Sequence, residues 1–184
     1  MKNLSKVSLL RVQLKNGESV ISNRKGIYCW WFKKNSAEII LSKLDLNESE
    51  INRIQKRDIE GEEYWALYLG ISNDMLGRAK WHILQKHSVS AVKHGTLSTL
   101  RQSLSALLDI DMSCSEEVVN MFMDNNCYWE WEYTDKDNAK KEETNALRSD
   151  DKCYPLNIQE NHTVRKDIIK KLKRIRKEHK KYPV

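Results

Sequence analysis

The most compact apolar run of this chain is GIYCWWF, at residues 26–32. A second run, YWALYLGI, lies at residues 64–71, and a third, CYWEWEY, alternates aromatic with acidic residues at residues 127–133. Short runs rich in aromatic and β-branched residues are typical of strands, and alternation is typical of a strand with one solvent-exposed face. The three runs therefore predict the core strands of one small sheet.

Helical patterns fill most of the sequence after the second run. Leucines recur at helical spacing between residues 97 and 108, and either Thr96 or Ser98 can cap the start of that helix. Further helices are predicted over about residues 75–86, 115–123 and 137–147. This order of elements predicts an α/β (α+β) fold with a small three-stranded, antiparallel-type mixed sheet flanked by helices.

The segments before and between the first two core strands have patterns of their own. Residues 7–14 predict a leading strand. Residues 33–63 are mostly polar, and we interpret them as an insertion between the first two core strands. Within the insertion, Asn47 is followed three residues later by Glu50, a spacing typical of a capping box at the start of a helix.

Positive charge is concentrated at the end of the chain. The net charge is +6, from 32 lysines and arginines and 26 acidic residues. From residue 163 onward the sequence contains ten lysines and arginines and two acidic residues, Asp167 and Glu178, a net charge of +8. The rest of the chain therefore has a net charge of −2. An apolar stripe predicts that about residues 163–181 form a basic C-terminal helix. Such a face can bind nucleic acid without sequence preference, and its alternative is a solvated helix held by its apolar stripe.

Length and composition indicate one domain in a reducing compartment. A chain of 184 residues with 40% hydrophobic residues suits a single domain over residues 1–184, with a core at about residues 25–160. The four cysteines form no CxxC pair, so we expect free thiols and a cytoplasmic location. We expect no signal segment and no membrane partner, because no run approaches the roughly 18 apolar residues that span a bilayer.

Residues that can carry chemistry follow one another in a definite order. The first two core strands contain Gly26-Ile27-Tyr28 and Tyr68-Leu69-Gly70, and later come Gly77-Arg78, His82, Glu143 and Pro155-Leu156-Asn157. The set and its order resemble the GIY-YIG nuclease family, and the sequence is also similar to a poorly characterised prokaryotic branch of it. The resemblance covers about residues 25–160 and depends on the combination, because each motif alone is weak.

The resemblance implies a metal-dependent endonuclease that hydrolyses phosphodiester bonds in DNA. Glu143 would be the single protein ligand of Mg²⁺ or Mn²⁺, since Mg²⁺ keeps much of its water and needs few carboxylates. Arg78 would be the phosphate clamp, because its planar guanidinium is permanently charged and matches phosphate oxygens.

The remaining family positions imply roles in proton transfer and in shaping the cleft. Tyr28 would be the general base, favoured as a phenolate by the metal and by Arg78. Tyr68 would orient water or phosphate, and His82, one helical turn after Arg78, would assist as a proton relay. Asn157 would tie the cleft together by hydrogen bonds.

Basic residues outside the motifs are candidate contacts to the nucleic acid. Besides Arg78 they comprise Arg101, near the N-terminus of a predicted helix, and Lys170, Lys173, Arg174 and Lys177 in the basic tail. For Arg101 the alternative is a solvated side chain.

Two departures from the family pattern and several alternatives stay open at this stage. The gap of 40 residues between Tyr28 and Tyr68 is longer than in minimal members, and the stretch from Leu69 to Gly77 lacks a lysine that some members have. Taken singly, each site residue has an ordinary structural role. The alternative functions are a non-catalytic nucleic-acid-binding module on the same fold, or a nuclease that acts on structured RNA. The oligomeric state is open; a double-strand cut would favour a dimer or two sequential nicks.

Overall fold

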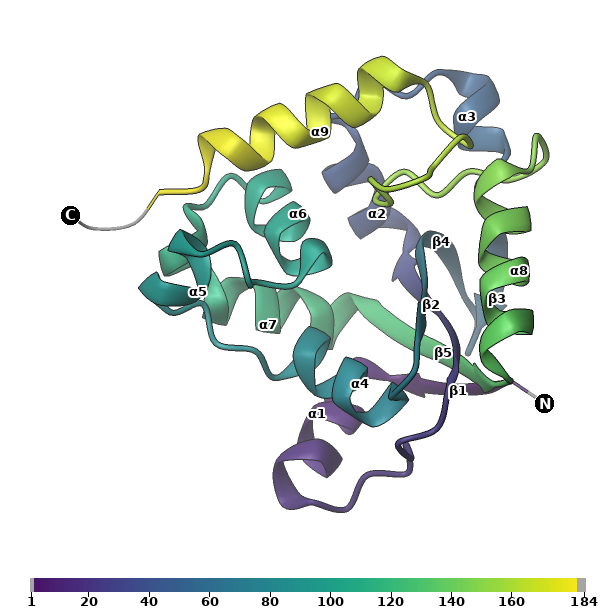
Figure 1. Cartoon of the computed structure of the whole chain (residues 1–184). Helices are drawn as coiled ribbons and strands as arrows, with labels where there is room; N and C mark the ends of the chain where they lie inside the picture. The colour runs from purple at the N-terminus through teal and green to yellow at the C-terminus, as the bar shows by residue number, and fades with distance from the viewer. Residues whose placement is uncertain (1, 182–184) are drawn as a thin grey trace.

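A five-stranded antiparallel sheet forms the centre of the protein (Figure 1). The computed structural model describes residues 2–181. The strand order is β1-β5-β2-β4-β3. The strands are β1 (Asn3–Lys6), β2 (Gly26–Lys33), β3 (Lys56–Ile59), β4 (Glu62–Ser72) and β5 (Cys127–Tyr133).

The three predicted core strands are confirmed as β2, β4 and β5, but the prediction of a three-stranded sheet is wrong. Two short strands extend the sheet, β1 beside β5 and β3 beside β4. β3 and β4 form a hairpin whose two turn residues, Glu60 and Gly61, have φ values of 56° and 82°. Positive φ at both central positions is the geometry that a tight two-residue hairpin requires. Sequence patterns detect such short polar strands poorly, because they have little apolar content.

Side chains of β2 alternate between two hydrophobic cores, one on each face of the sheet. Tyr28, Trp30 and Phe32 belong to the larger core, whereas Cys29 and Trp31 belong to the smaller one. This is the two-residue period of a strand that is buried on both faces.

Most helices cover the face of the larger core, and α8 covers part of the other face (Figure 1). The helices of the first half are α1 (Val7–Asn16), α2 (Lys34–Leu41), α3 (Glu48–Asn52), α4 (Met75–Ile83) and α5 (Val89–Lys93). Those of the second half are α6 (Thr99–Leu107), α7 (Glu116–Asn126), α8 (Lys136–Arg148) and α9 (Lys166–Glu178), with a 3-10 turn at Met112–Cys114. The mixed α+β class is therefore confirmed.

The predicted leading strand at residues 7–14 is wrong, because this segment is helix α1. Val7, Leu10 and Leu14 are buried while Leu9 and Val12 are exposed, which is a helical period. The helix ends at Gly17, whose φ of 75° is the left-handed conformation typical of a glycine C-cap.

The segment at residues 33–63 is an ordered part of the fold. It forms α2, α3 and β3, and α2 buries Ala37, Ile40 and Leu41. The capping box is confirmed: the side chain of Asn47 accepts from the Glu50 amide, and the Glu50 carboxylate accepts from the Asn47 amide.

Two further predictions concern the thiols and the membrane. All four cysteines are free, with Cys114 exposed and the other three buried. Within residues 2–181, none of the helices combines the length and the apolar character needed to cross a bilayer.

Candidate active site

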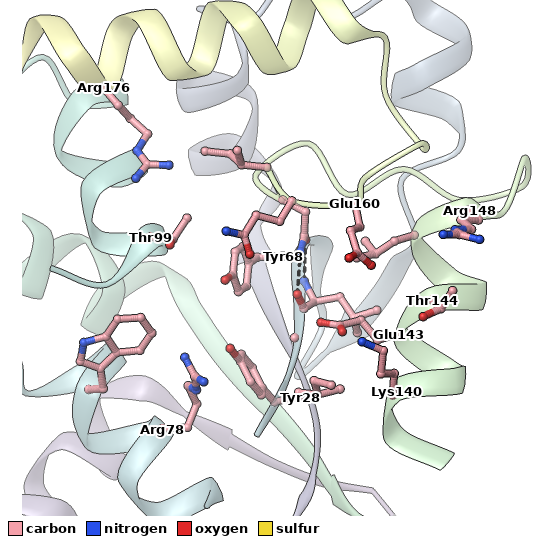
Figure 2. A pocket seen from close by; sticks show the side chains of 18 residues that line it. Tyr28, Tyr68, Arg78, Thr99, Lys140, Glu143, Thr144, Arg148, Glu160 and Arg176 are labelled. Atoms are coloured by element: carbon pink, nitrogen blue, oxygen red, sulfur yellow. Dashed lines mark hydrogen bonds between the residues drawn. The ribbon is translucent and has the colours of Figure 1, made fainter. Parts of the chain in front are cut away.

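The open edge of β4 determines where the site lies. β3 pairs with β4 only between Glu62 and Trp65, so in the described part of the chain the second half of β4 has a strand neighbour, β2, on one side only. A cavity of about 570 Å³ lies over this open edge (Figure 2). Its lining comes from β2, β4, α4, α6, α8, α9 and the loop after α8. Helices from both faces of the sheet therefore meet where the edge is uncovered.

The loop at residues 155–157 satisfies the backbone of this edge. The Asn157 side chain accepts from the Leu69 amide at 2.9 Å and donates to the Leu69 carbonyl at 2.7 Å, as the dashed lines in Figure 2 show. The Leu156 amide donates to the Leu67 carbonyl at 3.1 Å. Backbone groups that would otherwise be buried without partners are expensive, so these bonds fix the loop against β4 and shape one wall of the cavity.

Tyr28 and Tyr68 lie on the same face of the sheet and form the floor of the cavity. Their ring centroids are 6.4 Å apart. Tyr28 is paired with Gly70 across the strands, and a Cβ at Gly70 would stand 2.5 Å from the Tyr28 hydroxyl oxygen. The glycine of the second triplet is therefore required by the Tyr28 ring that lies against it.

Tyr28 is joined to a buried histidine behind the cavity. Its hydroxyl shares a hydrogen bond of 2.9 Å with His82 Nε2, and His82 Nδ1 shares one of 2.7 Å with the Ser98 hydroxyl. Burial, with the charges of Arg78 and Arg101, holds the pKa of His82 well below its usual value. Burial also raises the pKa of Tyr28 well above its usual value, Tyr68 raises it further and Arg78 opposes this. Both groups are therefore neutral near pH 7, with the phenol protonated.

Arg78 reaches the cavity from the first turns of α4. This helix is capped by Asp74, whose side chain accepts from the Gly77 amide at 2.9 Å. The Arg78 guanidinium lies over the Trp81 ring, 4.7 Å from its centroid. Stacking on an indole face holds a guanidinium in place and leaves its edge available to an anion.

Glu143 faces the cavity from α8, opposite Arg78 (Figure 2). Burial and the nearby Glu160 raise the pKa of Glu143, whereas Lys140, Arg78 and a hydrogen bond from the Ile71 amide lower it. Ile71 belongs to the same open edge of β4 as Leu69 and lines the cavity with Glu143, so this carboxylate lies beside the edge that holds the loop.

Several other residues that line the cavity were not predicted from the sequence. They include Thr99, Lys140, Arg148, Glu160 and Arg176. For Lys140 a signal existed, because it stands three residues before Glu143 on α8 and so shares a helix face with it. Glu160 in a loop and Arg176 among ten basic residues carried no local signal.

The predicted phosphate contact at Arg101 is corrected by the structure. Arg101 is 0% exposed, and its guanidinium donates to the His82 carbonyl at 2.9 Å, to His87 Nε2 at 2.7 Å and to the Asn120 side chain at 2.7 Å. Fully engaged inside the core, it cannot reach a nucleic acid from this position. His82 likewise does not line the cavity and reaches it only through Tyr28.

The four predicted contacts on the tail lie outside the cavity. Lys170, Lys173, Arg174 and Lys177 are exposed on α9 and are not part of the cavity lining. Arg174 pairs with Glu178 at 3.7 Å. They remain candidate contacts for a nucleic acid that extends beyond the cavity.

The donor set of the cavity fits a weakly coordinated hard cation. No group of three or more histidine, cysteine or acidic residues placed to hold a metal occurs among residues 2–181. Glu143 and Glu160 are the carboxylates of the cavity lining. One or two carboxylates, with water and substrate oxygens completing the shell, is an arrangement that Mg²⁺ or Mn²⁺ accepts.

Comparison with known proteins identifies one family. A family model described as the GIY-YIG catalytic domain matches residues 26–178. Searches of curated proteins and of solved structures find no match. The matched region contains all of the cavity-lining residues and extends into α9.

Proposed function

Because the chain belongs to the GIY-YIG family of nucleases, we propose that it is a metal-dependent endonuclease that hydrolyses phosphodiester bonds in DNA. One observation carries the proposal: Tyr28, Tyr68, Arg78, Glu143 and Asn157, which come from separate elements, line one cavity. The substrate class, the metal and the residue roles below are part of this proposal.

Arg78 and Glu143 supply the charge chemistry from opposite walls. Arg78 binds the non-bridging oxygens of the scissile phosphate through its guanidinium edge, while its face rests on Trp81. Glu143 would hold the divalent cation, and Glu160 is near enough to raise the pKa of the Glu143 carboxyl. When bound, such a cation neutralises phosphate charge and lowers the pKa of a coordinated water.

Tyr28 and His82 move the proton of the attacking water. As water attacks phosphorus and the bond from phosphorus to the leaving sugar oxygen breaks, Tyr28 takes a proton from the water and passes its own hydroxyl proton to His82 Nε2, 2.9 Å away. The leaving oxygen takes its proton from solvent. Neutral His82 accepts this proton in the tautomer whose Nδ1–H donates to the Ser98 hydroxyl, because Nε2 is then unprotonated. Burial opposes the charged forms of both groups, and the charge of Arg78 favours a phenolate at Tyr28 but disfavours a protonated His82.

Tyr68 and Asn157 complete the shape of the site. The Tyr68 hydroxyl, with its pKa raised by burial, stays protonated and can donate to phosphate or water. Asn157 acts on structure through its two bonds to Leu69. The stretch from Leu69 to Gly77 contains no lysine, but Lys140 of α8 lines the cavity.

A plasmid-nicking assay with Mg²⁺ or Mn²⁺ tests the proposal. Wild-type protein should convert supercoiled DNA to nicked circles, and Glu143→Gln or Arg78→Ala should lower the rate by about a hundredfold or more. Glu142→Gln is the matched control, because Glu142 is exposed and adjacent in sequence but lines a different cavity. It should leave the rate within about twofold, since substitutions of exposed residues away from a site change little.

The outcomes separate the candidate functions. If wild-type protein cuts neither DNA nor structured RNA with either metal, the proposal is wrong. Binding that needs no metal, survives Glu143→Gln and leads to no cleavage would instead identify a nucleic-acid-binding module. Cleavage of RNA but not DNA would keep the chemistry and change the substrate.

A further inference from the structure

Arg176 is the residue of the basic tail that reaches the cavity. It lies in the last turn of α9, a helix that buries Ile168 and Leu172, in earlier turns, against the core. The picture of the cavity shows its guanidinium pointing down from α9 toward Thr99 and Tyr68 (Figure 2). Its neighbours on α9, Lys173, Arg174 and Lys177, are exposed and are not part of the cavity lining.

The hydrogen bonding of Arg176 is incomplete. Its Nη2 donates to the Gln102 side chain, while its Nε is buried and has no partner among residues 2–181. A buried donor without a partner costs free energy, and in native structures it usually marks a place where a ligand or water belongs. Burial lowers the pKa of Arg176 to about 10, so it still carries a full charge near pH 7.

The surroundings of Arg176 favour an anion. Thr99, at the start of α6, lines the cavity beside it. The Ser98 side chain makes no capping bond to α6, because its hydroxyl is bonded to His82. Amides of a first helical turn have no acceptor within the helix and attract negative charge, which adds to the field of the arginine. The carboxylates of the cavity, Glu143 and Glu160, lie across from Arg176 on the other wall (Figure 2).

We propose that Arg176 binds a backbone phosphate of the nucleic acid in the cavity, beside the phosphate held by Arg78. This inference rests on the proposed function, because it takes a nucleic acid as the occupant of the cavity. Arg78 and Arg176 lie on the same wall with Tyr28 and Tyr68 between them and the carboxylates (Figure 2). Two guanidinium groups on one wall fit two phosphates of one strand and fix how that strand crosses the tyrosines.

The salt dependence of binding counts phosphate contacts and therefore tests this role. Binding of a fluorescent DNA duplex would be measured by anisotropy at several salt concentrations, with Glu143→Gln as the parent so that no cleavage occurs. Adding Arg176→Gln should weaken binding about ten- to a hundredfold. It should also reduce the magnitude of the negative slope of log K against log salt by about one, because one phosphate contact is lost. Adding Arg176→Lys should retain most of the slope but lose part of the affinity, because the planar fork is gone.

Two control variants separate phosphate binding from a structural role. Lys15→Gln removes the same charge from the exposed end of α1, outside the cavity, and should leave the slope unchanged. Gln102→Ala removes the internal partner of Arg176 and should also leave the slope unchanged. Thermal unfolding of each variant shows whether the fold is retained.

The inference is overturned if Arg176→Gln leaves the slope at the parent value, or if Gln102→Ala lowers it equally. It is also overturned if the parent binds no nucleic acid. Wild-type cleavage with an unchanged Arg176→Gln slope would leave the proposed function intact. A lowered slope in a protein that never cleaves would keep the binding role and reject the catalytic proposal.

Discussion

Replacing Gly70 with alanine tests whether the position of the Tyr28 hydroxyl matters for activity. The added Cβ would stand 2.5 Å from the hydroxyl oxygen and 2.6 Å from the ring carbon that bears it, whereas ordinary contact begins at 3.4 Å. The phenol must therefore move by about 1 Å, and a misplacement of about 1 Å can cost a hundredfold in rate. We expect Gly70→Ala to lower the single-turnover rate of DNA nicking by about that factor.

The same substitution also lowers stability. Tyr28 is 3% exposed and packs against Trp129 and His82, so the displaced ring disturbs a filled core. Overpacking of this kind costs about 1–3 kcal/mol. Gly17→Ala is the matched control: its Cβ would meet nothing within 4 Å, but φ is 75°, so it should lower stability without lowering the nicking rate.

A double-mutant cycle locates the effect. In a Tyr28→Phe background, Gly70→Ala should cause little further loss of nicking, because the group that it displaces is already absent. Wild-type nicking by a folded Gly70→Ala protein would refute the reasoning. Full additivity of the two substitutions would show that Gly70 acts through something other than Tyr28.

The remaining predictions concern the buried network behind the site. Arg101→Met should destabilise the protein by about 3–5 kcal/mol in urea unfolding, because His82, His87 and Asn120 lose their shared donor. The salt dependence of DNA binding should stay unchanged. A weaker salt dependence would restore Arg101 as a phosphate contact. Burial and Arg101 lower the pKa of His87 to about 4. Below about pH 6.5 the unfolded chain therefore binds more protons than the folded protein. The free energy of unfolding should fall as the pH is lowered from about 6.5 to 4, by at most about 3 kcal/mol from this group. His87→Gln should flatten that part of the stability curve, and an unchanged acid limb would contradict the assignment.

Local patterns were sufficient to predict the core strands and one helix cap. The capping box at Asn47 and Glu50 depends on residues three apart, so neighbouring sequence determines it. The site residues were expected instead from a combination of motifs, because the two tyrosine triplets, although each lies within a single strand, are weak signals alone. Residues 7–14 were misjudged because alternation at Leu10, Val12 and Leu14 also matches a strand. Packing against α7 and α4 selects the helix, and no local pattern contains that information.

Residues whose roles depend on distant parts of the chain could not be predicted. Arg101 stands near a helix N-terminus, where an arginine is equally often solvated, and only the docking of α4 and α7 around it shows that it is a core residue. Arg176 is one of ten basic residues in the tail, and only the packing of α9 on α6 directs it to the cavity. In both cases the sequence shows a positive charge, while the tertiary structure determines which groups the arginine contacts.

Ser98 shows how assembly of the site overrides a local rule. Either Thr96 or Ser98 was predicted to cap α6, and Ser98 is its N-cap. A serine there normally bonds its own helix, a bond worth about 1 kcal/mol. Here the hydroxyl is 2.7 Å from His82 Nδ1 instead, so α6 loses a side-chain cap and His82 gains a partner inside the core. The bond between Ser98 and His82 fixes the imidazole ring that Tyr28 contacts. It also leaves the first amides of α6, beside Arg176, without a side-chain cap. Ser98 therefore connects the proposed proton relay on the cavity floor with the proposed phosphate contact on the cavity wall, although these two features come from α4 and α9 and have no link in sequence.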